Sequence, residues 1–262
     1  MMDDRDWASF KQKLKAKTEI DLDLYKEAQM KRRVEGYVRK KGFDSSAQYF
    51  DSIVNSKADF DAFIEHLTIN VSEFFRNSDK FLQLEKEVIP YLLERSPKLN
   101  IWSAGCSIGA EPYSLAMILK EVTPGKQHRI LATDLDIEIL AKAKRGVYLP
   151  NEIQSMTKER VVRYFTQNTD GTYAVQNEIK RLIEFKRHNL LKDRFESGFD
   201  LILCRNVVIY FTEEAKFDLY TNFFKALKPG GILFVGGTES VINCRQIGYT
   251  TYKPFFYQRP LE

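Results

Sequence analysis

Apolar residues in the first 80 positions recur at the three- and four-residue spacing of amphipathic helices. Two such segments stand out, one with Met30, Val34, Tyr37 and Val38, the other with Phe60, Phe63, Ile64 and Leu67. Between them, Gly42 is suited to end a helix, and the polar run 44–46 to cap the next one. The pattern predicts a small all-α domain over residues 1–80, followed by an amphipathic linker helix within residues 81–97.

After Pro97 the pattern changes to short apolar runs of strand length that alternate with amphipathic segments. The expected strands are 99–103, 129–133, 200–204 and 231–235, and the expected helices are 111–121, 136–145 and 213–227. Such alternation is typical of a parallel sheet with both faces covered by helices. We therefore expect residues 98–262 to form a doubly wound, Rossmann-like α/β domain.

One segment, at about residues 147–183, interrupts the alternation. Its turn dipeptide, Asp170-Gly171, lies between the strand formers Tyr164-Phe165 and Tyr173-Ala174-Val175. The segment is predicted to form a small antiparallel β insertion.

Composition narrows the class of protein. The chain has 262 residues and a formal net charge of only +4, which does not by itself require a nucleic-acid partner. Residues 1–7 are charged where a secretory signal is apolar, and no apolar run approaches the roughly 18 residues of a membrane span. We expect a soluble, cytoplasmic protein with no membrane insertion.

The cysteines and histidines are scattered rather than set at the spacing of metal ligands. They are Cys106, Cys204, Cys244, His66, His128 and His188. We expect reduced thiols and no metal site.

The loop after the first expected strand, residues 104–111, is the candidate ligand site, because open α/β sheets bind ligands beyond the carboxyl ends of their strands. Its glycines, Gly105 and Gly109, do not follow the Gly-x-Gly-x-x-Gly spacing that holds a pyrophosphate, which favours the phosphate-free cofactor S-adenosylmethionine. Asp134, at the end of the second strand, is suited to accept both ribose hydroxyls. The alternative is that the glycines only permit a tight turn and that Asp134 caps the next helix.

Four segments, in one order, closely resemble the chemotaxis receptor methyltransferases, the CheR family. They are 68–76 (TINVSEFFR), 102–117 (WSAGCSIGAEPYSLAM), 132–136 (ATDLD) and 204–211 (CRNVVIYF). The resemblance extends over nearly the whole chain. It implies methylation of receptor glutamates with S-adenosylmethionine, which leaves S-adenosylhomocysteine as product.

The resemblance also implies a set of cofactor-binding residues, in addition to Gly105 in the glycine-bearing turn. They are Asn70, Ser72, Arg76, Glu111 at the amino-acid end, Asp134 at the ribose, Asn189, Leu190, Arg205 and Asn206. The sequence departs from the family at Ile108, where Thr is usual, and at Ala110, where Glu is usual. Ser72 replaces a usual Thr but keeps its hydroxyl.

Arg76 and Tyr210 are the candidate catalytic residues. A glutamate carboxylate, with an ordinary pKa of about 4.3, is already ionised at neutral pH, so methyl transfer to it needs no general base. Arg76 could hold that carboxylate through its planar guanidinium, and the Tyr210 hydroxyl could orient it. The alternatives are a surface cation for Arg76 and a core aromatic for Tyr210.

The segment from Lys26 to Lys41 is the candidate partner surface. It holds seven cations, Lys26, Lys31, Arg32, Arg33, Arg39, Lys40 and Lys41, against Glu27 and Glu35. It would attract the acidic cytoplasmic domain of a chemoreceptor, although a solvated helix face is the alternative. We expect the protein to act as a monomer; the sequence leaves open whether the β insertion binds a receptor peptide.

Two other functions compete with this interpretation. A nucleic-acid methyltransferase would use the basic helix on phosphates, but the Asn/Asp-Pro-Pro-aromatic motif of base-nitrogen methylation is missing after the fourth strand. Cys204 is interpreted as a small buried residue rather than the thiol nucleophile of a cytosine methyltransferase. The other alternative is a non-catalytic S-adenosylmethionine-binding adaptor.

Overall fold

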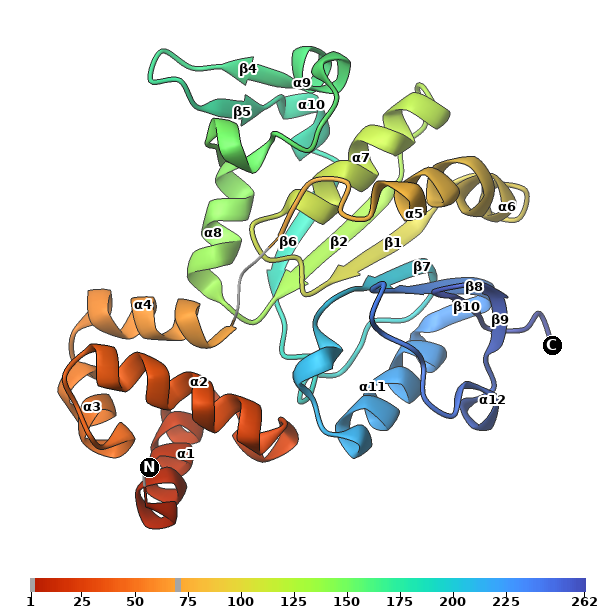
Figure 1. Ribbon diagram of the computed structural model, residues 1–262. Coiled ribbons are helices and arrows are strands. Elements are labelled where there is room, and N and C mark those ends of the chain that lie inside the picture. The colour runs from red at the N-terminus through yellow and green to blue at the C-terminus, as the bar shows by residue number, and fades with distance from the viewer. Residues whose placement is uncertain (1–2, 69–71) are drawn as a thin grey trace. The chain divides into compact units, whose positions relative to one another are not determined.

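The computed structural model describes residues 3–68 and 72–262 of the chain (Figure 1). The chain divides into two compact units. The first unit contains residues 1–69 and 208–216, and the second contains residues 70–207 and 217–262.

The first unit is helical, as the periodicity predicts. Its elements are α1 (Asp4–Thr18), η1 (Leu22–Leu24), α2 (Glu27–Lys40), α3 (Ser46–Ile53), α4 (Lys57–Thr68) and the 3₁₀ turn η4 (Val208–Tyr210). Ser45 is the N-cap that the polar run predicts, and its Oγ accepts a hydrogen bond from the Gln48 amide. That cap begins α3, an extra helix that lies in sequence between the two segments of helical spacing.

A short segment from the far end of the chain completes this unit. Residues 208–216 follow a strand of the second unit, yet Tyr25 and Phe211 form a β-bridge with their rings 5.0 Å apart. The Lys26 amide donates to the Tyr210 carbonyl at 2.8 Å. The first unit is therefore built from two separate stretches of sequence.

The second unit contains a seven-stranded sheet (Figure 1). In spatial order its strands are β6 (Ile183–Arg187), β2 (Arg129–Asp134), β1 (Asn100–Ala104), β7 (Phe199–Cys204), β8 (Leu227–Val235), β10 (Phe256–Gln258) and β9 (Thr250–Lys253). The first five are parallel, and β10 pairs antiparallel with both of its neighbours, β8 and β9. The predicted doubly wound α/β fold is confirmed. Chain order reverses between β1 and β7. Such sheets bind ligands at the carboxyl ends of the strands beside this point.

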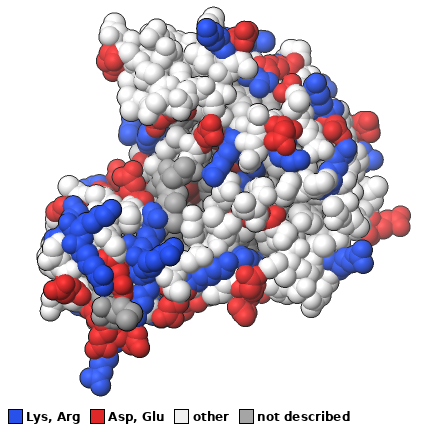
Figure 2. All heavy atoms as spheres, in the orientation of Figure 1, with Lys and Arg blue, Asp and Glu red and all other residues white. Residues whose placement is uncertain are grey.

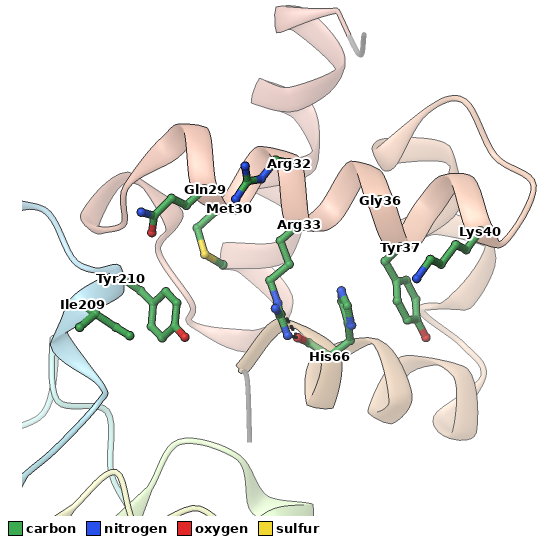
Figure 3. A pocket seen from close by; sticks show the side chains of 10 residues that line it. All are labelled: Gln29, Met30, Arg32, Arg33, Gly36, Tyr37, Lys40, His66, Ile209 and Tyr210. Atoms are coloured by element: carbon green, nitrogen blue, oxygen red, sulfur yellow. Dashed lines mark hydrogen bonds between the residues drawn. The ribbon is translucent and has the colours of Figure 1, made fainter. Parts of the chain in front are cut away.

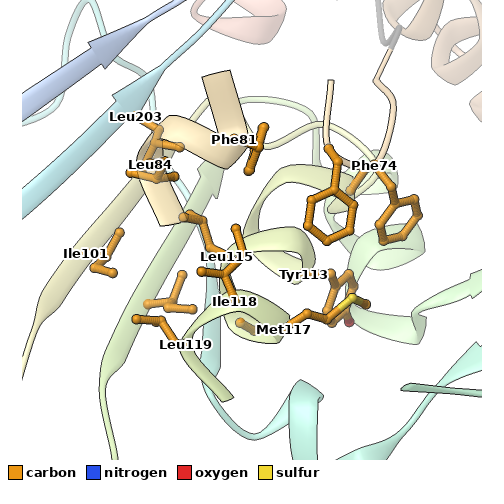
Figure 4. Packing of buried hydrophobic residues seen from close by; sticks show 14 of the residues in the cluster. Phe74, Phe81, Leu84, Ile101, Tyr113, Leu115, Met117, Ile118, Leu119 and Leu203 are labelled. Atoms are coloured by element: carbon orange, nitrogen blue, oxygen red, sulfur yellow. The ribbon is translucent and has the colours of Figure 1, made fainter. Parts of the chain in front are cut away.

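Helices flank this sheet, and the main apolar cluster of the unit packs between the sheet and several of them (Figure 4). They are α7 (Ala110–Val122), α8 (Ile137–Arg145), α11 (Glu213–Ala226), α12 (Cys244–Ile247) and the run α5 (Ser78–Gln83), η2 (Leu84–Val88) and α6 (Ile89–Leu93). In that run η2 is a π-helical turn, in which the Ile89 amide donates to the Leu84 carbonyl, and Pro90 follows at the start of α6.

The run 78–93 belongs to the core of the second unit. Phe81 and Leu84 pack in one cluster with Leu115 of α7 and Leu203 of β7 (Figure 4). The apolar face of the expected linker helix thus packs into the core of the α/β unit. The domain limits at residues 80 and 97 stay a prediction.

The insertion forms the predicted small antiparallel sheet. Its elements are β3 (Val147–Tyr148), η3 (Pro150–Glu152), α9 (Lys158–Tyr164), β4 (Phe165–Gln167), β5 (Tyr173–Val175) and α10 (Asn177–Lys180), with strand order β3-β5-β4. The turn joining β4 to β5 uses Asp170 and Gly171, and Gly171 has the positive φ, 83°, that glycine tolerates best.

Candidate active site

The glycine-bearing turn follows β1 and is held against the end of β2. The amides of Gly105 and Cys106 both donate to the Thr133 carbonyl, at 2.8 and 2.9 Å. Gly105 has a φ of 83°, and a Cβ there would lie 2.5 Å from Cγ2 of Val207. Gly109, with a φ of 89°, is the N-cap of α7. Both glycines are therefore required by the backbone of this turn.

Asp134 ties the turn to the loop after β2. Its Oδ2 accepts from the Ser107 amide at 2.8 Å, and its Oδ1 accepts from the Asp136 amide at 3.1 Å. The cap of α8 is Asp136, which accepts from the amides of Glu138 and Ile139, so the capping alternative for Asp134 does not hold. A carboxylate offers about four acceptor positions, which leaves capacity for further donors.

Burial is the main influence on the charge of Asp134. It raises the pKa of this carboxyl to about 6, although the amides of Asp136 and Ser107 oppose the shift. The group is therefore mostly ionised at neutral pH and gains a proton in mildly acidic solution.

Glu111, in the first turn of α7, is held on both carboxylate oxygens. Oε1 accepts from the Ser103 hydroxyl at 2.7 Å, and Oε2 lies 3.3 Å from Nη1 of Arg205. By contrast, Ala110 is fully buried in the apolar core, and so is most of Ile108. Glu111 is thus the carboxylate that this turn presents, despite the two departures from the family.

Arg205, directly after β7, links three segments. Its Nη2 donates to the Arg76 carbonyl at 2.8 Å and to Oδ1 of Asn77 at 2.9 Å. Its guanidinium carbon lies 4.6 Å from the ring centre of Phe234. With 3% of its side chain exposed, Arg205 is engaged mainly by the protein itself. It fixes the backbone of Arg76 relative to Glu111.

The backbone of Asn206 is left-handed, with a φ of 60°. The buried carboxylate of Glu239 accepts a hydrogen bond from its amide. Oε2 of Glu239 accepts from the amides of Asn206 and Gly236, at 2.8 and 2.7 Å. Sequence reasoning did not single out Glu239. The signal was available, since an acidic residue soon after β8 reaches the same edge of the sheet as the ends of β1 and β7.

The other predicted cofactor residues are placed as follows. Asn189 follows β6 and is buried; its Oδ1 accepts from the Leu191 amide at 3.0 Å. Leu190 and Ser72 are half-buried. Asn70 lies outside the described residues.

Several buried polar atoms at these strand ends have no partner in the described chain. They include Oγ of Ser107, Oδ1 of Asn206 and Nε of Arg205. Because unpaired buried polar atoms destabilise a protein, such atoms are typical of places that a ligand completes. The residues present therefore fit a ligand with several hydroxyl and amine groups, as S-adenosylmethionine has.

The two cysteines near the site are not poised for nucleophilic chemistry. Burial, reinforced by nearby carboxylates, raises the thiol pKa of Cys106 and Cys204 well above the usual range. Both thiols are protonated at neutral pH, and the thiolate is the nucleophilic form.

Tyr210 lies in the first unit, where it lines a groove with a volume of about 530 Å³ (Figure 3). Arg32, Tyr37 and Lys40 of α2 and His66 of α4 line the same groove. The rings of Tyr37 and His66 stack with centroids 4.4 Å apart. Burial lowers the pKa of His66, so its ring is neutral near pH 7.

The predicted basic segment divides into paired and unpaired cations. Lys31 pairs with Asp4 at 2.9 Å, Arg39 with Glu35 at 3.7 Å and Lys26 with Glu213 at 4.0 Å, while Nε of Arg33 donates to the His66 carbonyl at 2.7 Å. Arg32, Lys40 and Lys41 are exposed and form no ion pair with the described residues, and Nζ of Lys41 lies 5.6 Å from the centre of the Tyr37 ring. Figure 2 shows Lys and Arg side chains gathered on this face of the first unit. The unpaired positive charge therefore borders the groove.

The predicted residues thus form two groups. Gly105, Glu111, Asp134, Arg205, Asn206 and the Arg76 backbone gather at the carboxyl ends of β1, β2 and β7 in the second unit. Tyr210 belongs with the cations of the first unit. Among the described residues no three metal-ligating side chains gather, and no helix is both long and apolar enough to cross a bilayer.

Comparison with known proteins accounts for both units. The sequence profile of the CheR methyltransferase all-alpha domain matches residues 5–68, and that of the CheR methyltransferase S-adenosylmethionine-binding domain matches residues 70–252. The chain belongs to the CheR methyltransferase family. The resemblance carried by the four motifs is confirmed. The S-adenosylmethionine-binding domain of this CheR protein contains every expected cofactor residue, from Asn70 to Asn206.

Named relatives of this CheR protein are similar along most of their length. The chemotaxis protein methyltransferase of Listeria monocytogenes is 42% identical over 255 residues, which cover 97% of each chain. That of Borreliella burgdorferi is 32% identical over 250 residues, 89% of this chain and 88% of the relative. That of Escherichia coli is 33% identical over 213 residues, 78% and 73% respectively.

Proposed function

We propose that this CheR-family protein transfers a methyl group from S-adenosylmethionine to glutamate side chains of chemoreceptors. The observation that carries the proposal is the groove beside Tyr210, bordered by the unpaired cations Arg32 and Lys40. A groove of that charge suits an acidic protein surface. The names of the relatives, all chemotaxis protein methyltransferases, support the same substrate class.

The chemistry is a single displacement. The bond between the methyl carbon and the sulfonium sulfur breaks as a bond to a glutamate oxygen forms, which gives a methyl ester and S-adenosylhomocysteine without moving a proton. A cation and an anion neutralise each other, so fixing their line of approach in a dry site contributes most. The protein therefore needs positioning groups rather than a general base.

In the second unit, Asp134 would accept the ribose hydroxyls and Glu111 would face the amino-acid end of the cofactor. The unpaired Oδ1 of Asn206 and Oγ of Ser107 would complete the polar contacts. Asn70, Ser72, Asn189 and Leu190 are assigned to the remaining pocket by family resemblance. Gly105 keeps the turn close, and Arg205 holds Glu111 in place.

The catalytic roles fall to Arg76 and Tyr210. Arg76 would hold the incoming carboxylate, while Arg205 fixes its backbone through the carbonyl. Tyr210, which lines the cationic groove of the first unit, would orient a receptor carboxylate through its hydroxyl. Both groups act by hydrogen bonding to an ionised oxygen, the stronger class of hydrogen bond.

Methyl transfer to receptor-containing membranes tests the proposal. The wild-type protein, given radiolabelled S-adenosylmethionine, should label the receptors, and mild base should release the label as methanol because the product is an ester. Label on nucleic acid supplied in parallel would instead support the nucleic-acid methyltransferase. Calorimetric binding of the cofactor with no label on any acceptor would support the adaptor.

The cations of the groove provide a matched pair of variants. Arg32→Glu with Lys40→Glu should raise KM for receptor about tenfold and weaken its salt dependence, since screened attraction between opposite charges is lost. Lys31→Glu with Arg39→Glu is the control, because these two cations already pair with Asp4 and Glu35 and do not line the groove. Equal effects of both changes would argue against docking at this groove. Cytoplasmic location and a monomeric state stay predictions.

A further inference from the structure

Arg76 lies between two residues whose backbones are left-handed. Phe75 has a φ of 53° and Asn77 a φ of 60°. A positive φ is sterically unfavourable for residues that carry a side chain, and it is rare for a bulky residue such as phenylalanine. Such conformations persist only where the surrounding structure holds them, and they are frequent at active sites. The contacts that hold residues 74–77 therefore determine where the Arg76 side chain begins.

The α/β core supplies part of this support. Arg205 donates to the Arg76 carbonyl and to Oδ1 of Asn77. The Phe75 amide donates to the hydroxyl of Ser114, a buried residue of α7, at 3.0 Å. These hydrogen bonds fix the backbone after Phe75 and the amide before it.

The β insertion also contacts this segment, through Phe74. The Ser155 hydroxyl, in the turn before α9, donates to the Phe74 carbonyl at 2.9 Å. The Phe74 ring packs edge to face against Tyr148 and Phe165, with centroids 5.0 and 5.7 Å apart. Phe74 is fully buried in the main apolar cluster of the unit (Figure 4). The insertion therefore holds both the backbone and the ring of the residue two positions before Arg76.

Arg160, on helix α9 of the insertion, holds the next residue along. Its guanidinium carbon lies 4.3 Å from the centre of the Phe75 ring. Nε and Nη2 donate to the two carboxylate oxygens of Glu121 at 3.2 and 2.6 Å, and Nη2 also donates to Glu85 at 2.9 Å. A two-point contact with a carboxylate fixes the plane of a guanidinium, and the Phe75 ring lies against that plane. The position of the Phe75 ring is thus set from the insertion.

We propose that Arg160 and Ser155 are positioning residues for methyl transfer. Between them they hold Phe74 and Phe75 in the conformation from which Arg76 reaches the substrate carboxylate. The inference rests on the proposed function and on the role proposed there for Arg76. It gives the β insertion a part in the chemistry that does not depend on its binding a receptor peptide. A small displacement of a positioned group is enough to slow a reaction strongly.

Kinetics of the full-length protein, with receptor and S-adenosylmethionine both saturating, test the proposal. Arg160→Met should lower kcat about tenfold and Ser155→Ala about threefold, with KM for receptor unchanged, because neither residue touches the receptor. Arg160→Lys keeps the charge but not the planar fork, so it should restore only part of the rate. Arg163→Met is the control, since Arg163 is exposed on the same helix and lies against Tyr164 rather than Phe75.

A comparison in two backgrounds separates positioning from a general effect on the fold. In a chain that already carries Arg76→Ala, Arg160→Met should slow turnover no further, because the group that it positions is gone. An equal loss of kcat in both backgrounds, or normal turnover of Arg160→Met and Ser155→Ala, would overturn the inference. If Arg160→Met does not fold, as judged by circular dichroism, Ser155→Ala provides the same comparison.

The outcome for the wild-type protein distinguishes this inference from the proposed function. Labelled receptor glutamates together with equal losses in the two backgrounds would remove the positioning role and leave the function standing. A wild-type protein that esterifies no glutamate would refute the proposed function, and this inference with it.

Discussion

Arg205 and Glu111 form a buried ion pair, with 3.3 Å between Nη1 and Oε2 and only 3% and 12% of the two side chains exposed. The pair joins the residue after β7 to the first turn of α7. Because Nη2 of Arg205 also holds the Arg76 carbonyl, the ion pair connects a candidate cofactor ligand to a candidate catalytic residue.

Removing one partner of that pair should destabilise the protein strongly. Arg205→Met leaves the Glu111 carboxylate buried without its cation, and we expect a loss of about 3 kcal/mol in the free energy of unfolding. The double variant Arg205→Met/Glu111→Leu should be less destabilised than the sum of the single changes, as measured by urea unfolding. Strict additivity would mean that the two side chains do not interact in solution.

Asp134 should make cofactor affinity depend on pH. Burial raises its pKa to about 6, so lowering the pH through 6 protonates the carboxyl of the free protein. Ribose hydroxyls donate to the ionised form, so binding should weaken as the pH falls from about 7.5 to about 5.5 and should release protons near pH 6. Calorimetry in buffers of different ionisation enthalpy measures both effects. Asp134→Asn should bind weakly with a flat profile; a wild-type-like profile in this variant would assign the titration elsewhere.

Tyr210 should affect turnover rather than cofactor affinity, and Arg76, which is also an expected cofactor residue, should affect turnover even when the cofactor is saturating. A hydrogen bond to a charged group contributes about 1.5–3 kcal/mol, which corresponds to roughly 10- to 100-fold in rate. Arg76→Ala should therefore lower kcat by about 100-fold and Tyr210→Phe by about tenfold, measured with saturating receptor and cofactor. If both variants keep normal turnover, the catalytic assignment fails.

Glu239 should prove important for the shape of the site although it is not a proposed ligand. Glu239→Ala removes the acceptor shared by the Asn206 and Gly236 amides, and we expect a loss of about 2–3 kcal/mol in stability. Glu239→Gln keeps an acceptor oxygen and should lose less. Thermal unfolding of the two variants checks the order; a greater loss for glutamine would contradict the proposed contacts.

The fold was largely predictable from periodicity, and its exceptions have physical causes. Strand β6 was not expected, because at the sheet edge its Ile183 and Phe185 alternate with charged residues that face solvent. The short strands β9 and β10 carry too few apolar positions to signal a strand. Helix α3 was not expected because its 8 residues form only about two helical turns, too few for the apolar spacing to repeat clearly.

The site was predictable in its positions but not in its contacts. The carboxyl ends of β1 and β2 must lie together in a parallel sheet, so Gly105 and Asp134 could be named from the sequence pattern, whereas Arg205 was named from the family resemblance. Side-chain direction depends on packing, so the engagement of Arg205 by Glu111 and by the Arg76 carbonyl could not be read from sequence. Tyr210 lies with α2 because the chain returns to the first unit after β7. No local sequence pattern indicates that return.

The contact between Tyr25 and Phe211 limits how the helical unit could be exchanged between relatives. A chimera that replaces only the N-terminal stretch would place residues around position 25 from one parent against residues 208–216 from the other. Sequence changes in this unit must therefore keep two distant parts of the gene compatible. If the receptor docks on this unit as proposed, engineering of receptor choice would have to graft both parts from the same parent.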